Sequence, residues 1–346
     1  MDRRGRKRYL LVLTIFVLAA MAISAGIGAV SIPLAEVISI LLRRLPYAGN
    51  WIPHRGWPDA HETIILQVRF PRILLAAIIG ASLSGAGAVL QSLFRNPLAD
   101  PYIMGISSGA ALGGTIAIVS RLPSVLPGLS SVPVAAFVAS IATMAVVYLL
   151  AQVSGRVSVD TFLLSGVVVS SFLWAAMSFI MMVSGDSLRE IMMWLMGSLS
   201  NKSYSHVKMA APYAILGLAI LMAMARDFNI ISLGDDEARY LGINPEPAKR
   251  IAVLASSLVT AASVSVGGII GFVGLIVPHT MRMILGPDHR LMLPASVIAG
   301  GIFLVLADTV ARTLLAPAEI PVGIITALVG APFFFYVLRR SRVRGY

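Results

Sequence analysis

Apolar stretches of about 20 residues recur along almost the whole chain, and this pattern limits the fold more than any other feature. A helix of that length crosses the hydrocarbon core of a bilayer, where every backbone N–H and C=O must be satisfied internally. Hydrophobic residues make up 58% of the 346 residues and charged residues only 12%, with a mean hydropathy of +0.87. A soluble domain is therefore excluded. The sequence predicts an all-α polytopic membrane protein, with residues 1–346 forming a single transmembrane domain.

The stretches predict about ten spans, with both chain ends on the cytoplasmic side of the cell membrane. Basic residues favour that side, and they cluster before the first span and after the last. The net charge of +11 would suggest nucleic acid in a soluble protein, but here the cations lie at span ends, so the expected partner is the bilayer and not nucleic acid. The predicted spans are about 9–30, 73–93, 102–119, 134–152, 162–183, 207–225, 251–266, a stretch within 267–282, 295–310 and 324–338.

The connecting segments carry further expectations. Residues 31–68 form the predicted external loop, in which 31–45 has the apolar spacing of an amphipathic helix lying on the outer interface. Residues 184–200 are too short to cross and too apolar to be free, which predicts a partial helix at the outer mouth. Gly105, Gly109 and Gly113 recur every four residues, and this spacing predicts close helix packing.

Two arginines stand where a positive charge is not expected. Arg69 and Arg72, in the sequence RFPR, precede the second span at its outer end, and Pro71 fits the first turn of that helix. They indicate either a docking point for acidic groups or side chains that reach to the interface. Asp308, one turn before Arg312, is interpreted as a local partner of that arginine, with a proton carrier as the alternative.

His279 invites a metal or proton-relay interpretation. No second ligand lies near it in the sequence, so a hydrogen-bonded structural histidine is the favoured interpretation, and no metal site is predicted.

The longest polar interruption is residues 231–250. Its acidic residues after Gly234 suit a helix start, and Gly242 supplies a stop. The helix between them is too short to be stable alone, so it must rest on another element. Arg226, Lys249 and Arg250 assign it to the cytoplasmic face. It is either an ordinary connecting loop or a contact for a soluble partner.

The sequence also excludes several functions. It has no Gly-Lys pair, hence no P-loop, and its spans carry almost no acids of the kind that ion-coupled carriers use near the membrane midplane. It has no cysteine, and its serine, histidine and aspartate residues form no recognisable nucleophile setting. The chain is therefore expected not to be an enzyme, to have no catalytic residues and to bind no cofactor. A passage driven by another subunit is favoured over an ion-coupled secondary transporter.

Five sequence blocks together resemble one protein family. They are RFPRILLAAIIGASLSGAGAVLQSLFRNPLADPYIMGISSGA, LGDDEARYLGI, GGIIGFVGLIVPHTMR, GPDHRLMLPAS and LADTVARTLLAPAEIPVGIITALVGAPFFFYVL. In this order they resemble the permease subunits of binding-protein-dependent ABC importers for iron–siderophore complexes, haem and cobalamin. The resemblance covers nearly the whole chain beyond the first span and implies a BtuC-like permease fold.

The resemblance also implies partners and cargo. It implies two cytoplasmic ATPase subunits that hold ATP and Mg²⁺, an extracytoplasmic substrate-binding protein, and a second permease copy, most simply in a homodimer. An iron–siderophore complex is the expected cargo, with cobalamin or haem as alternatives carried by the same machinery.

Site residues follow from the resemblance as well. Arg69, Arg72 and Arg312 match arginines that dock the binding protein. The cytoplasmic gate would lie at Val159 and Asp160, where the aspartate departs from the small hydroxyl residues usual in relatives. The residues that match the ATPase-coupling helix are Gly234, Asp235, Glu237, Ala238, Tyr240, Leu241 and Gly242.

Overall fold

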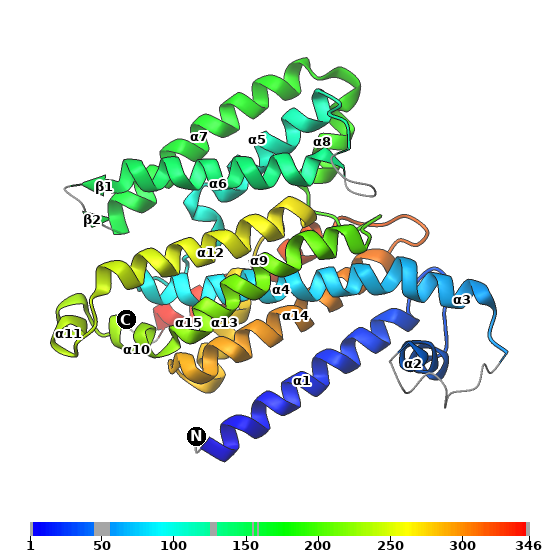
Figure 1. Ribbon diagram of the computed structural model, residues 1–346, viewed down its shortest axis with the longest axis horizontal. Coiled ribbons are helices and arrows are strands. Elements are labelled where there is room, and N and C mark those ends of the chain that lie inside the picture. Colours follow the sequence, from blue (N-terminus) through cyan, green and yellow to red (C-terminus); the bar gives the residue numbers. More distant parts are fainter. Residues whose placement is uncertain (1–2, 45–55, 125–129, 154–155, 158, 344–346) are drawn as a thin grey trace.

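The computed structural model describes residues 3–44, 56–124, 130–153, 156–157 and 159–343. The regular secondary structure of this part of the chain is helical except for one minimal hairpin (Figure 1). Strands β1 (Gln152–Val153) and β2 (Arg156–Val157) pair antiparallel. The helices are α1 (Arg3–Gly26), α2 (Leu34–Arg43), α3 (Asp59–Thr63), η2 (Ile64–Arg69), α4 (Phe70–Leu93), η3 (Pro101–Met104), α5 (Ile106–Val119), α6 (Ser131–Ala151), α7 (Val159–Val183), η4 (Gly185–Ser187), α8 (Leu188–Leu195), α9 (Tyr204–Ala223), α10 (Ala225–Ile231), α11 (Asp235–Tyr240), α12 (Pro245–Gly267), α13 (Val273–Leu285), α14 (His289–Thr313) and α15 (Val322–Val343).

Ten apolar helices coincide with the ten predicted spans. Among the described residues, seven are long and apolar enough to cross a membrane, and three are shorter. The seven are residues 8–26, 59–93, 131–151, 161–183, 204–223, 245–267 and 289–313, and the shorter ones are 106–119, 273–285 and 322–337. The all-α polytopic fold is therefore confirmed.

Helix α4 is the centre of the molecule, and α12, α13 and α14 pack around it (Figure 1). Glycines allow the closest approaches. A Cβ at Gly80 would overlap the Gly300 carbonyl of α14, and one at Gly87 would overlap the Gly274 carbonyl of α13. In a membrane, where lipid tails are as apolar as leucine, such backbone proximity supplies the packing that holds helices together.

The second span begins earlier than predicted. Pro71 lies in the first turn of α4, as predicted, but helical structure continues back to Asp59 through α3 and η2. The turn before Pro71 is a π-helix, η2, in which each carbonyl accepts from the N–H five residues on. Since proline has no N–H, the Leu66 carbonyl loses that donor. The Tyr204 hydroxyl of α9 donates to it instead, at 2.8 Å.

The glycine spacing in the third span was mostly interpreted correctly. Gly109 faces Thr143, and Gly113 faces the Ala135 carbonyl, so α5 and α6 do pack closely along this face. Gly105 has a different role. Its φ of +78° places it in the left-handed region between η3 and α5, where it breaks the span into two helical pieces.

A second break separates α12 from α13. Gly268 and Phe272 both have positive φ, at +71° and +69°, and the residues between them are not helical. Backbone groups in such a segment need outside partners. The Tyr102 hydroxyl of η3 supplies them, donating to the Ile270 carbonyl at 3.0 Å and accepting from the Ile270 N–H at 3.2 Å.

The remaining predicted segments also form helices. The amphipathic segment at 31–45 contains α2, which buries Val37 and Ile40 and exposes Leu34, Ile38 and Leu42. The partial helix predicted within 184–200 is α8. Figure 1 shows α2 and α3 at one end of the molecule, and α10, α11 and both chain ends at the other.

Candidate functional site

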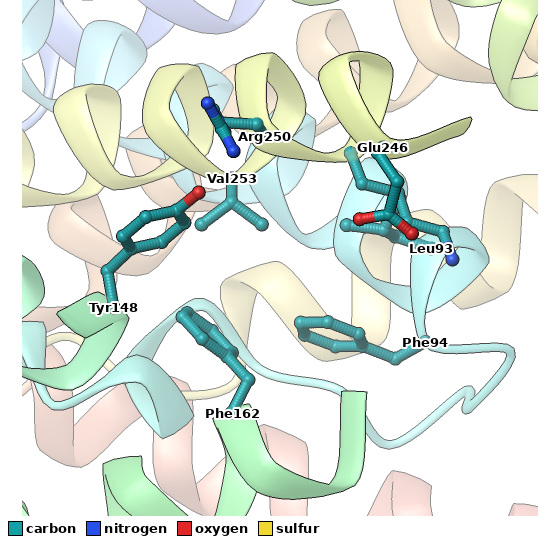
Figure 2. Close-up of a pocket in the computed structure, with 8 residues that line it drawn as sticks. Leu93, Phe94, Tyr148, Phe162, Glu246, Arg250 and Val253 are labelled. Atoms are coloured by element: carbon teal, nitrogen blue, oxygen red, sulfur yellow. The ribbon is translucent and has the colours of Figure 1, made fainter. Parts of the chain in front are cut away.

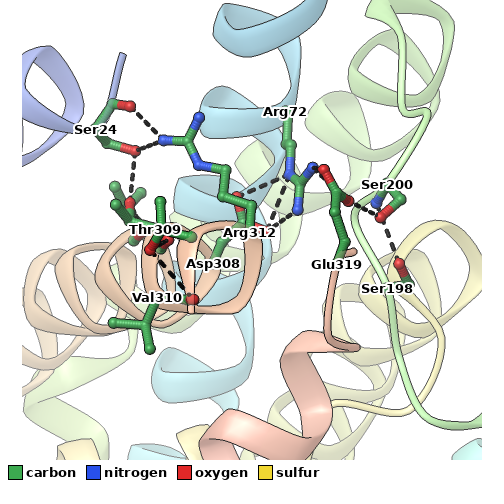
Figure 3. Close-up of polar contacts among 11 residues, drawn as sticks. Ser24, Arg72, Ser198, Ser200, Asp308, Thr309, Val310, Arg312 and Glu319 are labelled. Carbon is green, nitrogen blue, oxygen red and sulfur yellow. Dashed lines mark hydrogen bonds and ion pairs between the residues drawn. The ribbon is translucent and has the colours of Figure 1, made fainter. Parts of the chain in front are cut away.

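At the end of the molecule that carries α3, Arg72 forms a buried ion-pair cluster with two carboxylates (Figure 3). Its Nε and Nη2 both donate to Asp308 of α14, at 2.8–3.0 Å, and its Nη1 donates to Glu319 at 2.9 Å. Glu319 also accepts from the Ser200 hydroxyl. The cluster therefore ties α4 to the end of α14, to the start of α15 and to the segment after α8.

Arg312 and Arg69 complete the cluster from the α1 side. Arg312 donates to the carbonyl and hydroxyl of Ser24, which also bonds Thr309 at 2.7 Å. Arg69 donates to the carbonyls of Ala25 and Val30, where α1 ends. A guanidinium offers five donors in a fixed plane, so each arginine can bridge several elements.

All three arginines line one cavity. The cavity has a volume of about 240 Å³ and is also lined by Ala316, Pro317 and Glu319. Arg69, Arg72 and Arg312 are nevertheless only 6–7% exposed. Most of their donors bond inside the chain, but the buried Nε of Arg312 has no hydrogen-bond partner among the described residues. The sequence predicted these three residues as a group, and the structure brings them together.

The pairing inside the cluster differs from the sequence interpretation. Asp308 pairs with Arg72, which is 236 residues away in the sequence, and not with neighbouring Arg312. The ninth span turns Asp308 toward α4, whereas Arg312 points toward α1 (Figure 3). Sequence reasoning also missed Glu319. Burial raises the pKa of Glu319. The Ser200 hydroxyl and Arg72 lower this pKa by more, so the net pKa lies below its ordinary value.

At the opposite end, α10 and α11 project from the helical bundle (Figure 1). Helix α11 begins after Gly234, as predicted, and the chain turns at Gly242, whose φ is +82°. Asp235 pairs with Lys249 of α12 at 2.5 Å, which holds the short helix against the bundle. Ala238 is buried, but Tyr240 is 91% exposed and Leu241 59%. A helix that is anchored by one ion pair and presents two apolar side chains outward is suited to contact a partner.

The predicted gate lies at the start of α7, but the side chains of Val159 and Asp160 are outside the described residues. Phe162, one turn later, is buried and lies 6.1 Å from Phe94 between ring centroids. Figure 2 shows both rings beneath the first turns of α12, in a pocket of about 30 Å³ whose other wall includes Arg250 over the Tyr148 ring. The start of α7 is therefore held by aromatic contacts.

His279 lies in α13 against the rings of Phe333 and Phe334. Its buried Nδ1 has no hydrogen-bond partner among the described residues, so the hydrogen bond expected at this histidine is not found at that atom. Among those residues no group of three or more His, Cys, Asp or Glu is placed to hold a metal ion.

Comparison with known sequences gives one consistent result. Residues 14–340 match the model of the FecCD transport family. The chain is 44% identical to the cobalamin import system permease protein BtuC of Halobacterium salinarum over 96% of this chain and 89% of that protein. It is 39% identical to the hemin transport system permease protein HmuU of Yersinia pestis, over 99% of this chain and 98% of that protein.

The fold agrees with the sequences. A solved structure described as an inward-facing metal-chelate type ABC transporter superposes with a TM-score of 0.82 and 32% identity, covering 96% of this chain and 99% of that one. Such permeases are transport components and not catalytic enzymes, and the ion-coupled alternative is set aside. Together with the ten apolar helices, these likenesses show that the chain belongs to the FecCD transport family, as the membrane-spanning permease of an ABC importer.

Proposed function

We propose that this permease imports a metal chelate, most specifically an iron–siderophore complex, with cobalamin or haem as the alternative cargo. The observation that carries the class is a groove of about 550 Å³ along α15. Its lining has no charged side chain and includes small residues such as Gly323, Ala327 and Ala331. A wide, weakly binding surface suits a bulky cargo that must leave easily, since tight polar contacts would slow its release.

Most names of relatives favour the same class without choosing within it, since they include permeases for cobalamin, haemin and ferric dicitrate. Another relative is named for molybdate, which is an oxyanion and not a chelate. The test is uptake by vesicles that contain the complete importer with its binding protein, supplied in turn with ⁵⁵Fe-siderophore, haem and radiolabelled cobalamin. ATP-dependent uptake of the iron complex alone supports the specific proposal, and uptake of cobalamin or haem alone rejects it.

We infer that the energy for transport reaches this chain through α11. We propose that Tyr240 and Leu241 contact an ATPase subunit on the cytoplasmic face, one subunit for each permease copy, while ATP and Mg²⁺ stay on that partner. Replacing both residues with aspartate is expected to abolish co-purification of the ATPase while the chain still inserts. Leu315→Asp is a control matched to Leu241, because Leu315 is about as exposed, at 61%, but lies at the opposite end of the molecule. Undiminished association of the double variant would reject this contact.

We propose that an extracytoplasmic binding protein docks over the cavity lined by Arg69, Arg72 and Arg312. Three arginines against two carboxylates leave a positive excess there, which would attract acidic side chains. Because the arginines also stabilise the fold, the effect of their charge on docking must be separated from a loss of stability. Glu319→Gln is expected to tighten capture of the binding protein at low salt, and Arg312→Gln to weaken it. Equal effects of the two substitutions on the dissociation constant would refute the electrostatic contact.

Two permease copies are proposed to enclose the passage, with the start of α7 as its cytoplasmic gate. Most of the outward surface of α7 is apolar, as is that of α15, where Leu328 and Phe335 are exposed. Native mass spectrometry of the detergent-solubilised importer measures the stoichiometry, and a single permease copy in the active complex would reject the pair. Val159 and Asp160 are tested as the gate by substitution to serine, which should raise ATP-independent leak if they close the passage.

A further inference from the structure

A continuous set of polar side chains begins in α10, just before the proposed ATPase-contact helix. Asn229 of α10 donates through Nδ2 to Asp288 Oδ1 at 2.8 Å. Its Oδ1 accepts from the backbone N–H of His289 at 2.8 Å and lies 2.9 Å from His289 Nδ1. Asn229 therefore fastens α10 to the start of α14 by two contacts with His289, its first residue, and one with Asp288, the residue before it.

The direction of each hydrogen bond follows from which atoms can donate and which can only accept. The carboxylate of Asp288 can only accept, so the Asn229 amide must turn its oxygen toward the imidazole. That oxygen also only accepts, so Nδ1 of His289 carries the proton. In the neutral ring Nε2 then accepts from the Ser92 hydroxyl of α4, at 2.7 Å, and Ser92 in turn accepts from Arg282 of α13 at 3.1 Å. Donors and acceptors are matched at every step from α13 to α10.

Gln91, the neighbour of Ser92, carries the connection to the first turn of α13. In an α-helix the Gly274 carbonyl would accept from the N–H of residue 278, but residue 278 is proline. Gln91 Nε2 takes the place of that missing donor, at 3.1 Å from the Gly274 carbonyl and 3.2 Å from that of Leu275. A side chain of α4 therefore completes the backbone of α13.

The first turn of α13 adjoins the groove along α15. It follows directly on the break at 268–272, in which Ile269 lines the groove. Phe272, the residue before α13, packs against α15 so tightly that a Cβ at Gly330 would overlap its ring. A displacement of this turn would therefore also displace residues that line the groove.

We propose that Gln91, Ser92, Asn229, Arg282 and His289, here called the polar relay, are positioning residues that transmit movement of α10 and α11 to the first turn of α13 and to the groove. The proposal rests on the proposed ATPase contact at α11. Apolar contacts would let these helices slide past one another, whereas sliding would break matched buried hydrogen bonds and leave their donors and acceptors unsatisfied. The joined elements therefore move together.

The test uses the natural absence of cysteine. Ala331→Cys, on the groove wall, serves as the parent in the complete importer with its ATPase subunits. Its reaction rate with a water-soluble maleimide is measured without nucleotide and with Mg-ATP plus vanadate. The parent is expected to show at least a fivefold change. Asn229→Ala and Gln91→Leu, each added to the parent, should keep the ATPase bound but bring the two rates within twofold.

A rescue variant separates the loss of relay contacts from a loss of stability. Pro278→Ala restores an N–H for the Gly274 carbonyl, so Gln91→Leu with Pro278→Ala regains stability. It does not regain the hydrogen bond that Gln91 Oε1 accepts from Arg282 Nη1, at 3.4 Å. We expect this double variant to bind the ATPase normally and to lack the nucleotide response. Ser84→Ala is the matched control, because it removes a buried 2.8 Å bond from α4 to the Ser296 carbonyl outside the relay and should respond fully.

Three results would overturn the relay: no response in the parent, a full response in the double variant, or loss of response in Ser84→Ala as well. ATPase co-purification tests the contact at α11, and the maleimide response tests the relay, so the two proposals can fail separately.

Discussion

At the scale of single residues, Arg72 is notable because it forms ion pairs with two carboxylates, those of Asp308 and Glu319. Its guanidinium meets two carboxylates in a site where its own side chain is 9% exposed and that of Asp308 only 1%. A buried pair of this kind adds little net stability compared with an apolar pair, but removing one partner leaves a charge with no counterpart. The cluster therefore makes the start of α4 and the end of α14 sensitive to single substitutions and tolerant of paired ones.

Arg72→Met is expected to destabilise the chain by about 3–5 kcal/mol, because it leaves Asp308 charged and buried without its partner. Adding Asp308→Asn should recover most of that loss. Thermal unfolding in detergent, followed by circular dichroism, measures both. A double variant as unstable as Arg72→Met would mean that shape, and not charge, dominates at this position.

Lys202, between α8 and α9, offers a test by pH. Desolvation by burial lowers the pKa of Lys202 to about 8 from its ordinary 10.5. Between those values the unfolded chain binds the proton and the folded chain does not, so stability rises as pH rises through this window. Lys202→Met removes the penalty and should stabilise the protein at pH 7 by on the order of 2 kcal/mol, after allowance for partial exposure.

The advantage of Lys202→Met over the natural chain should shrink as pH increases from 8 toward 10. Lys208→Met, which removes an exposed lysine of α9, is the matched control and should show no such trend. A stability difference that stays constant over this range would show that the Lys202 charge does not oppose folding.

At the scale of elements, the spans could be predicted from the sequence, but the side chains that complete the backbone at their interruptions could not. Hydrophobic runs set span length, so all ten were found, and the acidic start and glycine stop located α11. The π-turn before Pro71 and the break at 268–272 depend on donors from other helices, Tyr204 and Tyr102, which no local pattern reveals. For the same reason Asp308 was assigned to its sequence neighbour Arg312 and not to Arg72.

Helix contacts at glycine give the prediction for this scale. Gly80→Ala should force α4 and α14 apart, since the added Cβ meets the Gly300 backbone, and should destabilise the chain by about 1–3 kcal/mol. Gly271→Ala is the control, because its Cβ would have nothing within 4 Å. Thermal unfolding compares the two. Equal behaviour would show that the α4–α14 interface can expand without loss.

At the scale of the whole molecule, the two candidate surfaces lie at opposite ends of α4. Arg72 is near its start, and Ser92, which reaches His289 and α10, is near its end, so at 1.5 Å per residue they are about 30 Å apart. That is the thickness of a bilayer core. We therefore expect the arginine cavity and the α11 tip to face different compartments. The basic chain ends lie on the same side of the molecule as α11 (Figure 1).

The positive-inside tendency predicts the orientation: we expect α10, α11 and both basic ends to lie in the cytoplasm. Because the chain has no cysteine, Asp236→Cys on α11 and Ala318→Cys beside Glu319 each provide a single reactive site at an exposed position. A membrane-impermeant maleimide added to intact spheroplasts is expected to label Ala318→Cys at once and Asp236→Cys only after lysis. The reverse pattern would invert the topology, and with it would exchange the compartments of the ATPase and the binding protein. Labelling of both sites before lysis would mean that the two ends are not separated by the membrane, contradicting the distance that α4 sets between them.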